Sequence, residues 1–139
     1  MTKVFNLTEA VFLGSHCCAL LGSSDRRMSA KELAEGTSSS EHHINKVMRR
    51  LHRAGIVDST RGPSGGYEMA AGSADKTLLE LYEILEGPVR GEACPFGRNK
   101  CPFDYCRLGN QIRRISVEFT EFLRHTTLGN LSENKGGDC

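Results

Sequence analysis

The chain has 139 residues, six of them cysteines, and a formal net charge of +1. Its length suits one domain with a single hydrophobic core, and its near-neutral charge leaves any attraction to nucleic acid to local clusters of basic residues. Residues 1–22 lack the pattern of a signal peptide, and no run reaches the roughly 18–20 apolar residues of a membrane span. We therefore expect a cytoplasmic protein with no membrane partner, whose cysteines serve metal or redox chemistry rather than a disulfide framework.

The first predicted helix covers residues 8–21, where apolar side chains recur at helical spacing. Thr8 can cap its N-terminus. Cys17 and Cys18 lie in the middle of this helix, and we interpret them as small core residues.

Two further helices and a short turn follow. Ser29 and Glu32 form a capping box that opens a helix over residues 30–35, and Gly36 is expected to end it. The next predicted helix, residues 41–54, carries apolar residues at three- and four-residue steps, the spacing of a helix packed on a core. Two helices joined by a tight Gly/Ser turn predict a helix-turn-helix.

The polar face of the second of these helices is basic. Glu41 is the only acidic residue between positions 41 and 53, and hydrogen-bonding side chains stand near the N-terminal end, which a recognition helix presents to the major groove. The alternative is an ordinary solvated basic face. We predict DNA binding, and the residues assigned to it on and just before this helix are Ser40, His42, Asn45, Lys46, Arg49, Arg50 and Arg53.

A β-hairpin is predicted next, with strands at residues 56–60 and 67–70. Three glycines and a proline within residues 61–66 indicate the turn. A helix-turn-helix followed by a hairpin is a winged helix. We assign Arg61, Gly62 and Ser64 of the wing to DNA binding, because an arginine at the wing base could enter the minor groove or hold a phosphate. The alternative is an ordinary hairpin with a surface arginine.

Two more helices complete the predicted elements. A capping box at Thr77 and Glu80 opens a helix over residues 78–86. After a cysteine-rich loop comes a long amphipathic helix whose apolar face is too large for so small a domain to cover. A twofold partner helix would bury it, and packing within its own chain is the alternative. The residues assigned to dimerisation are Leu108, Ile112, Ile115, Phe119, Phe122 and Leu123.

The loop between these helices holds three cysteines within thirteen residues: Cys94, Cys101 and Cys106. Thiolates gathered in one loop are typical of a zinc site, an iron–sulfur cluster or a redox switch. Zinc is disfavoured because no pair has the spacing of two to four residues found in structural zinc sites. A cluster-free thiol/disulfide or metal-responsive regulator is the alternative function. An iron–sulfur electron-transfer protein is a weaker one, because no second cluster motif, nucleotide loop or catalytic triad is visible.

Four segments carry a resemblance to a known family. Residues 61–67, RGPSGGY, closely match the family's wing, and residues 51–56, LHRAGI, match the end of its recognition helix. Residues 77–87, TLLELYEILEG, match its next helix, and residues 127–131, TLGNL, its C-terminal motif. Over nearly all of residues 5–131 the chain resembles the Rrf-two-type winged-helix transcription regulators, the IscR/NsrR-like iron–sulfur repressors.

The resemblance implies a homodimeric repressor rather than an enzyme. Its partner would be double-stranded DNA with a roughly palindromic operator, and it would have no small-molecule substrate. The resemblance also implies that Cys94, Cys101 and Cys106 ligate a 4Fe–4S or 2Fe–2S cluster that senses redox state, nitric oxide or iron–sulfur status. Here the cysteines are separated by six and then four residues, where five and five is common in the family, and this leaves the cluster type open.

The fourth ligand of the cluster is the open position. IscR-like members have a histidine three residues after the last cysteine, where this chain has Gly109. NsrR-like members donate an acidic residue of the first helix across the dimer, and Glu9 stands at the matching position. We therefore predict that Glu9 of one subunit completes the cluster of the other. The alternative is an acidic residue that simply favours a helix N-terminus.

Together these observations predict a mainly α chain with a small β-hairpin wing. We expect a winged-helix DNA-binding domain at residues 1–87 and a cluster-binding loop at residues 88–107. The dimerisation helix and the C-terminal motif would occupy residues 108–131, and residues 132–139, polar and rich in glycine, would form a disordered tail.

Overall fold

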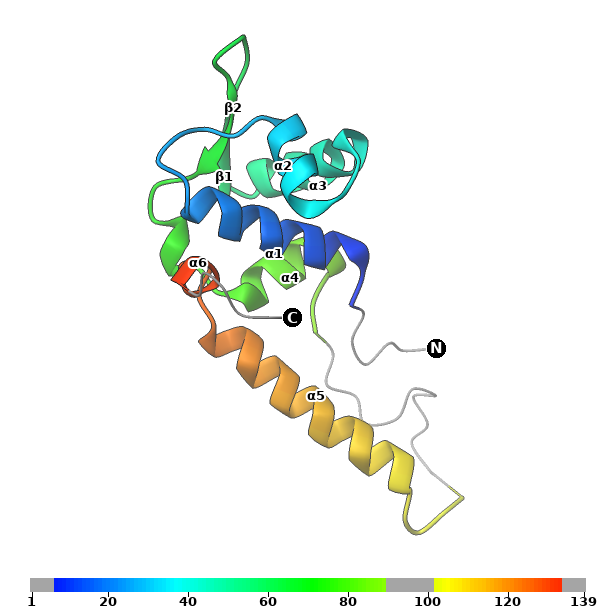
Figure 1. Cartoon of the computed structure of the whole chain (residues 1–139). Coiled ribbons are helices and arrows are strands. Elements are labelled where there is room, and N and C mark those ends of the chain that lie inside the picture. The colour runs from blue at the N-terminus through cyan, green and yellow to red at the C-terminus, as the bar shows by residue number, and fades with distance from the viewer. Residues whose placement is uncertain (1–6, 90–101, 134–139) are drawn as a thin grey trace.

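The computed structural model describes residues 7–89 and 102–133. It is mainly helical with one antiparallel hairpin, in agreement with the fold expected from the sequence (Figure 1). The elements in chain order are α1 Glu9–Gly22, α2 Ala30–Thr37, α3 Glu41–Arg53, β1 Val57–Thr60, β2 Gly66–Met69, the short 3-10 helix η1 Ser73–Asp75, α4 Leu78–Glu86, α5 Arg107–His125 and α6 Asn130–Glu133.

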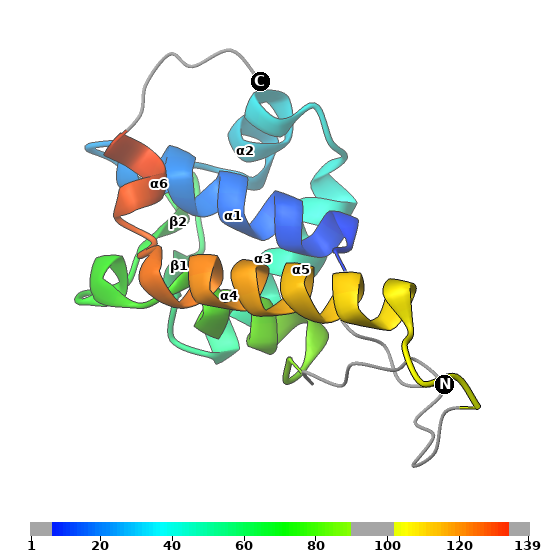
Figure 2. The same cartoon turned by 90° about the horizontal axis from the view of Figure 1, so that it is seen from below.

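Helix α1 lies at the centre of the fold and contacts α2, α3, α4, α6 and β2 (Figure 2). Several of its buried residues are small. A Cβ atom added at Gly14 would lie 2.9 Å from Leu85, so the glycine permits the close approach of α4. Cys17 and Cys18 are fully buried, which confirms their interpretation as core residues. Burial raises the pKa of both thiols to about 12, with the neighbouring Cys17 adding to the effect at Cys18.

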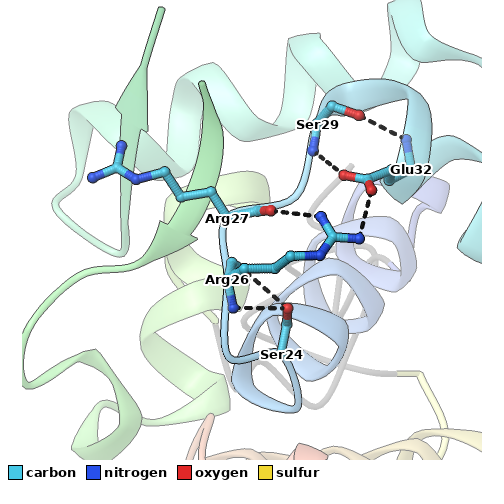
Figure 3. A network of polar contacts seen from close by, with 5 residues as sticks. All are labelled: Ser24, Arg26, Arg27, Ser29 and Glu32. Atoms are coloured by element: carbon cyan, nitrogen blue, oxygen red, sulfur yellow. Dashed lines mark hydrogen bonds and ion pairs between the residues drawn. The ribbon is translucent and has the colours of Figure 1, made fainter. Parts of the chain in front are cut away.

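A polar network fixes the start of α2 (Figure 3). The Ser29 hydroxyl accepts from the Glu32 N–H at 3.1 Å, and the Ser29 N–H donates to the Glu32 carboxylate at 2.8 Å, as the capping box predicts. Arg26 pairs with the same carboxylate at 2.7 Å. The hydrogen bonds from Arg26 and from the Ser29 backbone lower the pKa of Glu32 to about 2. The chain therefore enters α2 in a defined direction.

Helix α2 does not end where the sequence suggested. Gly36 lies inside it, and a Cβ atom there would meet Leu20 at 2.9 Å. The glycine therefore allows α2 to lie against α1 instead of stopping the helix. The helix ends after Thr37, and the next residue, Ser38, has the left-handed φ of 53° that ends many helices.

The wing is joined to the body by the segment that precedes α2. Strands β1 and β2 pair in antiparallel register from Val57–Met69 to Thr60–Gly66, within one residue of the predicted strands. Met28 forms a bridge to Tyr67 on the free edge of β2. The Met28 N–H donates to the Tyr67 carbonyl and the Tyr67 N–H donates to the Met28 carbonyl, with nitrogen-to-oxygen distances of 2.9 and 2.8 Å. A Cβ atom at Gly66 would lie 2.5 Å from the Met28 carbonyl oxygen, so only glycine permits this pairing.

Helix α4 begins and ends at the predicted residues. Helix α1 lacks the capping hydrogen bond that was predicted at its N-terminus. Thr8 occupies the N-cap position of α1, but its side chain makes no capping hydrogen bond. It donates instead to the carboxylate of Glu86 at the end of α4. The expectation that the Thr8 side chain caps α1 is therefore wrong, because a contact distant in sequence takes its hydroxyl.

Helix α5 extends away from the body at the end opposite the wing (Figure 1). Its C-terminal half packs against α4, where Phe119 meets Tyr82 edge-on with ring centroids 6.4 Å apart. Leu123 is only 1% exposed, within the chain's own core. The assignment of Leu123 to dimerisation is therefore wrong. One edge of the apolar stripe faces α4. The other edge is exposed to solvent: the side chain of Leu108 is 69% exposed and that of Phe122 is 55% exposed.

The C-terminal boundary also shifts. Helix α6 includes Ser132 and Glu133, which the sequence assigned to a disordered tail, and residues 134–139 lie outside the described part of the chain. Within residues 7–89 and 102–133, no helix combines the length and the apolar character required to cross a bilayer.

Candidate nucleic-acid interface and cysteine site

Helix α3 separates apolar and polar side chains on two faces. Its inner face is buried on the core through Ile44, Val47, Met48 and Leu51. The Ser40 hydroxyl caps its first turn by accepting from the His43 N–H at 3.2 Å. The opposite face therefore points to solvent, and the exposed α3 residues that the sequence assigned to DNA binding are His42, Lys46, Arg49, Arg50 and Arg53.

Asn45 is different, because it is half-buried and tied to the wing. The Tyr67 hydroxyl donates to the Asn45 side-chain oxygen at 2.9 Å. Tyr67 is only 9% exposed, and burial raises its pKa, while the charge of Arg49 opposes the shift. The bond fixes the amide of Asn45 so that its NH₂ group stays available as a donor. Tyr67, which closes the wing motif RGPSGGY, is not among the site residues predicted from the sequence.

The guanidinium group of Arg50 is bound to α4, whereas the sequence placed it among the DNA-facing cations of α3. Its guanidinium Nη2 donates to the carbonyl oxygens of Ile84 and Leu85 at 2.9 and 2.8 Å. These carbonyls lie in the last turn of α4, on the side of α3 that faces the body. Arg50, although exposed, therefore has its guanidinium bound to α4, and its assignment to DNA binding stays a prediction.

The wing residues Arg61, Gly62 and Ser64 are exposed. The Gly65 N–H donates to the Gly62 carbonyl at 3.0 Å, and Gly62 has a φ of +107°, which a residue with a side chain rarely adopts. The hairpin projects beyond α2 and α3 (Figure 1). A basic helix face and a wing with an exposed arginine therefore lie toward one end of the molecule, and α5 lies toward the other.

The predicted cysteine site is only partly within the described residues. Cys94 and Cys101 lie outside them. Cys106 is exposed at the N-cap position of α5, where its sulfur accepts from the Gly109 N–H at 3.2 Å. Hydrogen bonds to ligand sulfurs are among the interactions that tune iron–sulfur clusters. Across residues 7–89 and 102–133, no three potential ligands of the His, Cys, Asp or Glu type gather at one point.

Glu9, the predicted fourth ligand, is the exposed first residue of α1. It borders an open cleft of about 380 Å³ between α1, α3 and the end of α4, which Lys46, Arg50 and Glu86 also line. The carboxylate is therefore within the reach of a second molecule, and it borders the same cleft as residues of α3 and of the last turn of α4.

Comparison with known proteins identifies the family. Residues 7–134 match the model of the Rrf2 family, described as iron-dependent transcriptional regulators. The chain belongs to the Rrf2 family. The HTH-type transcriptional regulator IscR of Klebsiella pneumoniae is 29% identical over 105 residues, which cover 75% of this chain and 64% of IscR. A regulator named BadM from Rhodopseudomonas palustris is 39% identical over 67 residues, 48% of this chain and 43% of BadM. The chain thus spans less than two thirds of the length of these curated relatives.

A solved structure supports the same conclusion. CymR, the global cysteine regulator of Bacillus subtilis, superposes with a TM-score of 0.70 and 25% identity, over 95% of this chain and 97% of CymR. The prediction of a winged-helix transcription regulator, rather than an enzyme, is therefore confirmed at the level of fold and family.

The bond between the wing and the recognition helix of this Rrf2 protein can be measured by a double-mutant cycle. We expect the substitutions Tyr67→Phe and Asn45→Ala to be non-additive in the free energy of unfolding. Their coupling should be about 0.5–1.5 kcal/mol, the usual net contribution of one hydrogen bond. Urea denaturation of the two single variants and the double variant would provide the value. Tyr67→Phe paired with Arg53→Ala serves as the control, and it should be additive.

Proposed function

We propose that this Rrf2-family protein is a homodimeric repressor that binds a roughly palindromic DNA operator under the control of an iron–sulfur cluster. The observation that carries the DNA-binding part is that α3, with its exposed basic residues, and the wing lie at the same end of the molecule, opposite α5 (Figure 1). His42, Lys46, Arg49 and Arg53 are exposed on that face, and in the described part of the chain no ion pair neutralises any of them. Of these, the cations Lys46, Arg49 and Arg53 on an exposed helix face suit the phosphates that border a major groove.

The two kinds of side chain on α3 suit different tasks. Asn45 offers an amide whose orientation is fixed by Tyr67, and asparagine can bond adenine bidentately. The arginines and Lys46 are flexible cations that suit phosphates. The wing arginine, Arg61, stands at the base of the exposed turn, where the minor groove would lie if α3 entered the major groove. Base discrimination would therefore rest on Asn45, and general affinity on the cations.

Two substitutions on α3 separate these tasks. Asn45→Ala should lose about 1–3 kcal/mol of discrimination between operator and random DNA. Arg53→Gln should weaken both DNAs alike and lower the salt slope of log K by about 0.9, the value for one phosphate contact. Fluorescence anisotropy over a range of salt concentrations measures both effects. Arg124→Gln, which removes the same charge from α5, should change neither. Wild-type binding by both α3 variants would show that this helix does not read DNA.

The dimer is proposed from the uncovered edge of α5. Leu108, Ile115 and Phe122, spaced seven residues apart on one edge of a 19-residue helix, are between 43% and 69% exposed. Apolar surface of this extent on a projecting helix is characteristic of a protein interface. The stripe is long and straight, so a second copy related by a twofold axis could cross it and bury both faces at once.

Two neighbouring residues of α5 allow a matched test. Phe122→Ala, at an exposed side chain, should weaken self-association, measured as the dimer dissociation constant by sedimentation velocity. Leu123→Ala, at a side chain that is 1% exposed, should instead lower the free energy of unfolding by about 2–5 kcal/mol through loss of core packing. Wild-type sedimentation of Phe122→Ala and of Leu108→Ser would remove α5 as the interface.

The cluster is proposed from the chemistry of the donor set. Three thiolates of Cys94, Cys101 and Cys106 would hold it, and Glu9 of the partner subunit would complete it. Of these residues, the structure describes Cys106 and Glu9, and both are exposed and able to reach a ligand outside their own helix. When bound, an iron–sulfur cluster supplies a centre whose ligation changes with redox state or nitric oxide. A carboxylate is a harder donor than thiolate, so the site would release iron readily.

Anaerobic purification tests the ligand set. We expect wild-type protein to contain iron and sulfide and to absorb broadly near about 400 nm, as iron–sulfur proteins do. Cys106→Ala should abolish the absorption, and Glu9→Ala should make it decay faster in air. Cys17→Ala, at a buried thiol, serves as the control and should retain the cluster. Colourless wild-type protein after anaerobic reconstitution would support the cluster-free thiol regulator instead, for which the similarity to CymR and the exposed Cys106 provide the argument.

A further inference from the structure

The last turn of α4 joins three parts of the proposed regulator. The helix ends at Glu86, and the chain then enters the cysteine-rich loop through Gly87. The recognition helix α3 reaches this turn through Arg50, and the N-terminus of α1 reaches it through Thr8. We call this last turn, with its contacts to Arg50 and Thr8, the α4 joint.

Arg50 meets an unsatisfied end of a helix. Within an α-helix, the carbonyl of Ile84 would accept from residue 88, but that residue is Pro88 and has no N–H. Helix α4 ends before Val89, which would have served the carbonyl of Leu85. One guanidinium nitrogen of Arg50 donates to both carbonyls at 2.9 and 2.8 Å. The positive charge also suits the negative end of the helix dipole.

The same joint is bound on its other side by α1. The Thr8 hydroxyl donates to the carboxylate of Glu86, one residue beyond the carbonyls that Arg50 holds. Glu9, the residue proposed to reach the partner subunit's cluster, follows Thr8 directly in the chain. An open cleft of about 380 Å³ is lined by Thr8, Arg50 and Glu86, and also by the buried apolar residues Leu13, Val47 and Leu85, so these hydrogen bonds act beside apolar packing of the three helices.

We propose that Arg50 is a positioning residue that transmits the state of the cysteine site to the recognition helix. This inference rests on the proposed function. A conformational change in the loop after α4 would displace the α4 joint. A displacement of Glu9 would also reach the joint, because Thr8 is bound to Glu86. In both cases Arg50 passes the displacement to α3, because its backbone belongs to α3 and its guanidinium is bound to α4.

The symmetry of a dimer makes this joint the meeting point of two signals. In each protomer the loop that follows the joint contributes thiolates to that protomer's own cluster. Glu9, beside the same joint, would contribute to the partner's cluster. Each recognition helix would therefore respond to both clusters through one arginine.

The test compares Arg50→Gln with Arg53→Gln, which removes the same charge from the same helix without a contact to α4. Operator affinity is measured by anisotropy for the cluster-bound and the cluster-free form of each protein. In wild type the two forms should differ by roughly 5–150-fold, the range of ordinary allosteric coupling. Arg53→Gln should keep this ratio while weakening both forms. Arg50→Gln should reduce the ratio to below about threefold, well under that range.

The salt dependence of binding distinguishes a positioning role from a phosphate contact. Arg53→Gln should lower the salt slope by about 0.9, whereas Arg50→Gln should leave it at the wild-type value because the guanidinium is held by α4. A fall of about 0.9 in the salt slope of Arg50→Gln, or an unchanged ratio between the cluster forms, would overturn the proposal. Iron content and thermal melting of Arg50→Gln show whether the variant is folded and loaded.

A measurement on cluster-free protein keeps this inference separate from the proposed cluster. Hydrogen exchange of the peptide covering residues 83–89 should slow when operator DNA binds wild type, since coupling between two sites is reciprocal. The slowing should disappear in Arg50→Gln and persist in Arg53→Gln. Equal slowing in all three proteins would overturn the role of Arg50. If the protein never acquires iron but shows the expected exchange pattern, the proposed cluster would be overturned, while the proposal that Arg50 couples α4 to α3 would stand.

Discussion

The packing of small residues on α1 is the constraint on which the fold depends. The elements α2, α3, α4, α6 and β2 all contact α1, and a close approach to its axis requires small side chains at the contact. Gly14, Cys17 and Cys18 provide this, and α4 reaches α1 at a position where a single methyl group would already meet Leu85. The opposite side of α1 is met in the same way by α2, through Gly36 and Leu20. The position of α3, and so of its outward basic face, follows from this tight centre.

Local signals in the sequence predicted most of the fold. The capping boxes at Ser29 and Thr77 set the starts of α2 and α4 as expected, because both partners lie within one helical turn. The apolar spacing of α3 predicted its buried face correctly. Gly36 misled the prediction, since a glycine that ends a helix and a glycine that admits a neighbouring helix look the same in a sequence.

The candidate site was less predictable because its decisive contacts join distant residues. Arg50 looked like one more cation on a basic face, and its bonds to α4 cross more than thirty positions of the chain. Tyr67 and Asn45 are separated by 22 positions. In the sequence, Leu123 continues the apolar stripe of α5. Part of that stripe packs on the chain's own core and part is exposed to solvent, and only the tertiary structure shows which residues belong to each part. Periodicity identifies a face, whereas the partner of that face depends on the fold.

The hydrogen bond between Tyr67 and Asn45 has an evolutionary consequence. If α3 reads DNA as proposed, a descendant of this protein that came to recognise another base at this position would have to replace Asn45. That replacement alone would leave the nearly buried hydroxyl of Tyr67 without its partner, at a cost to stability. The wing and the recognition helix would therefore diverge together, with substitutions at positions 45 and 67 arising as pairs among lineages with different operators.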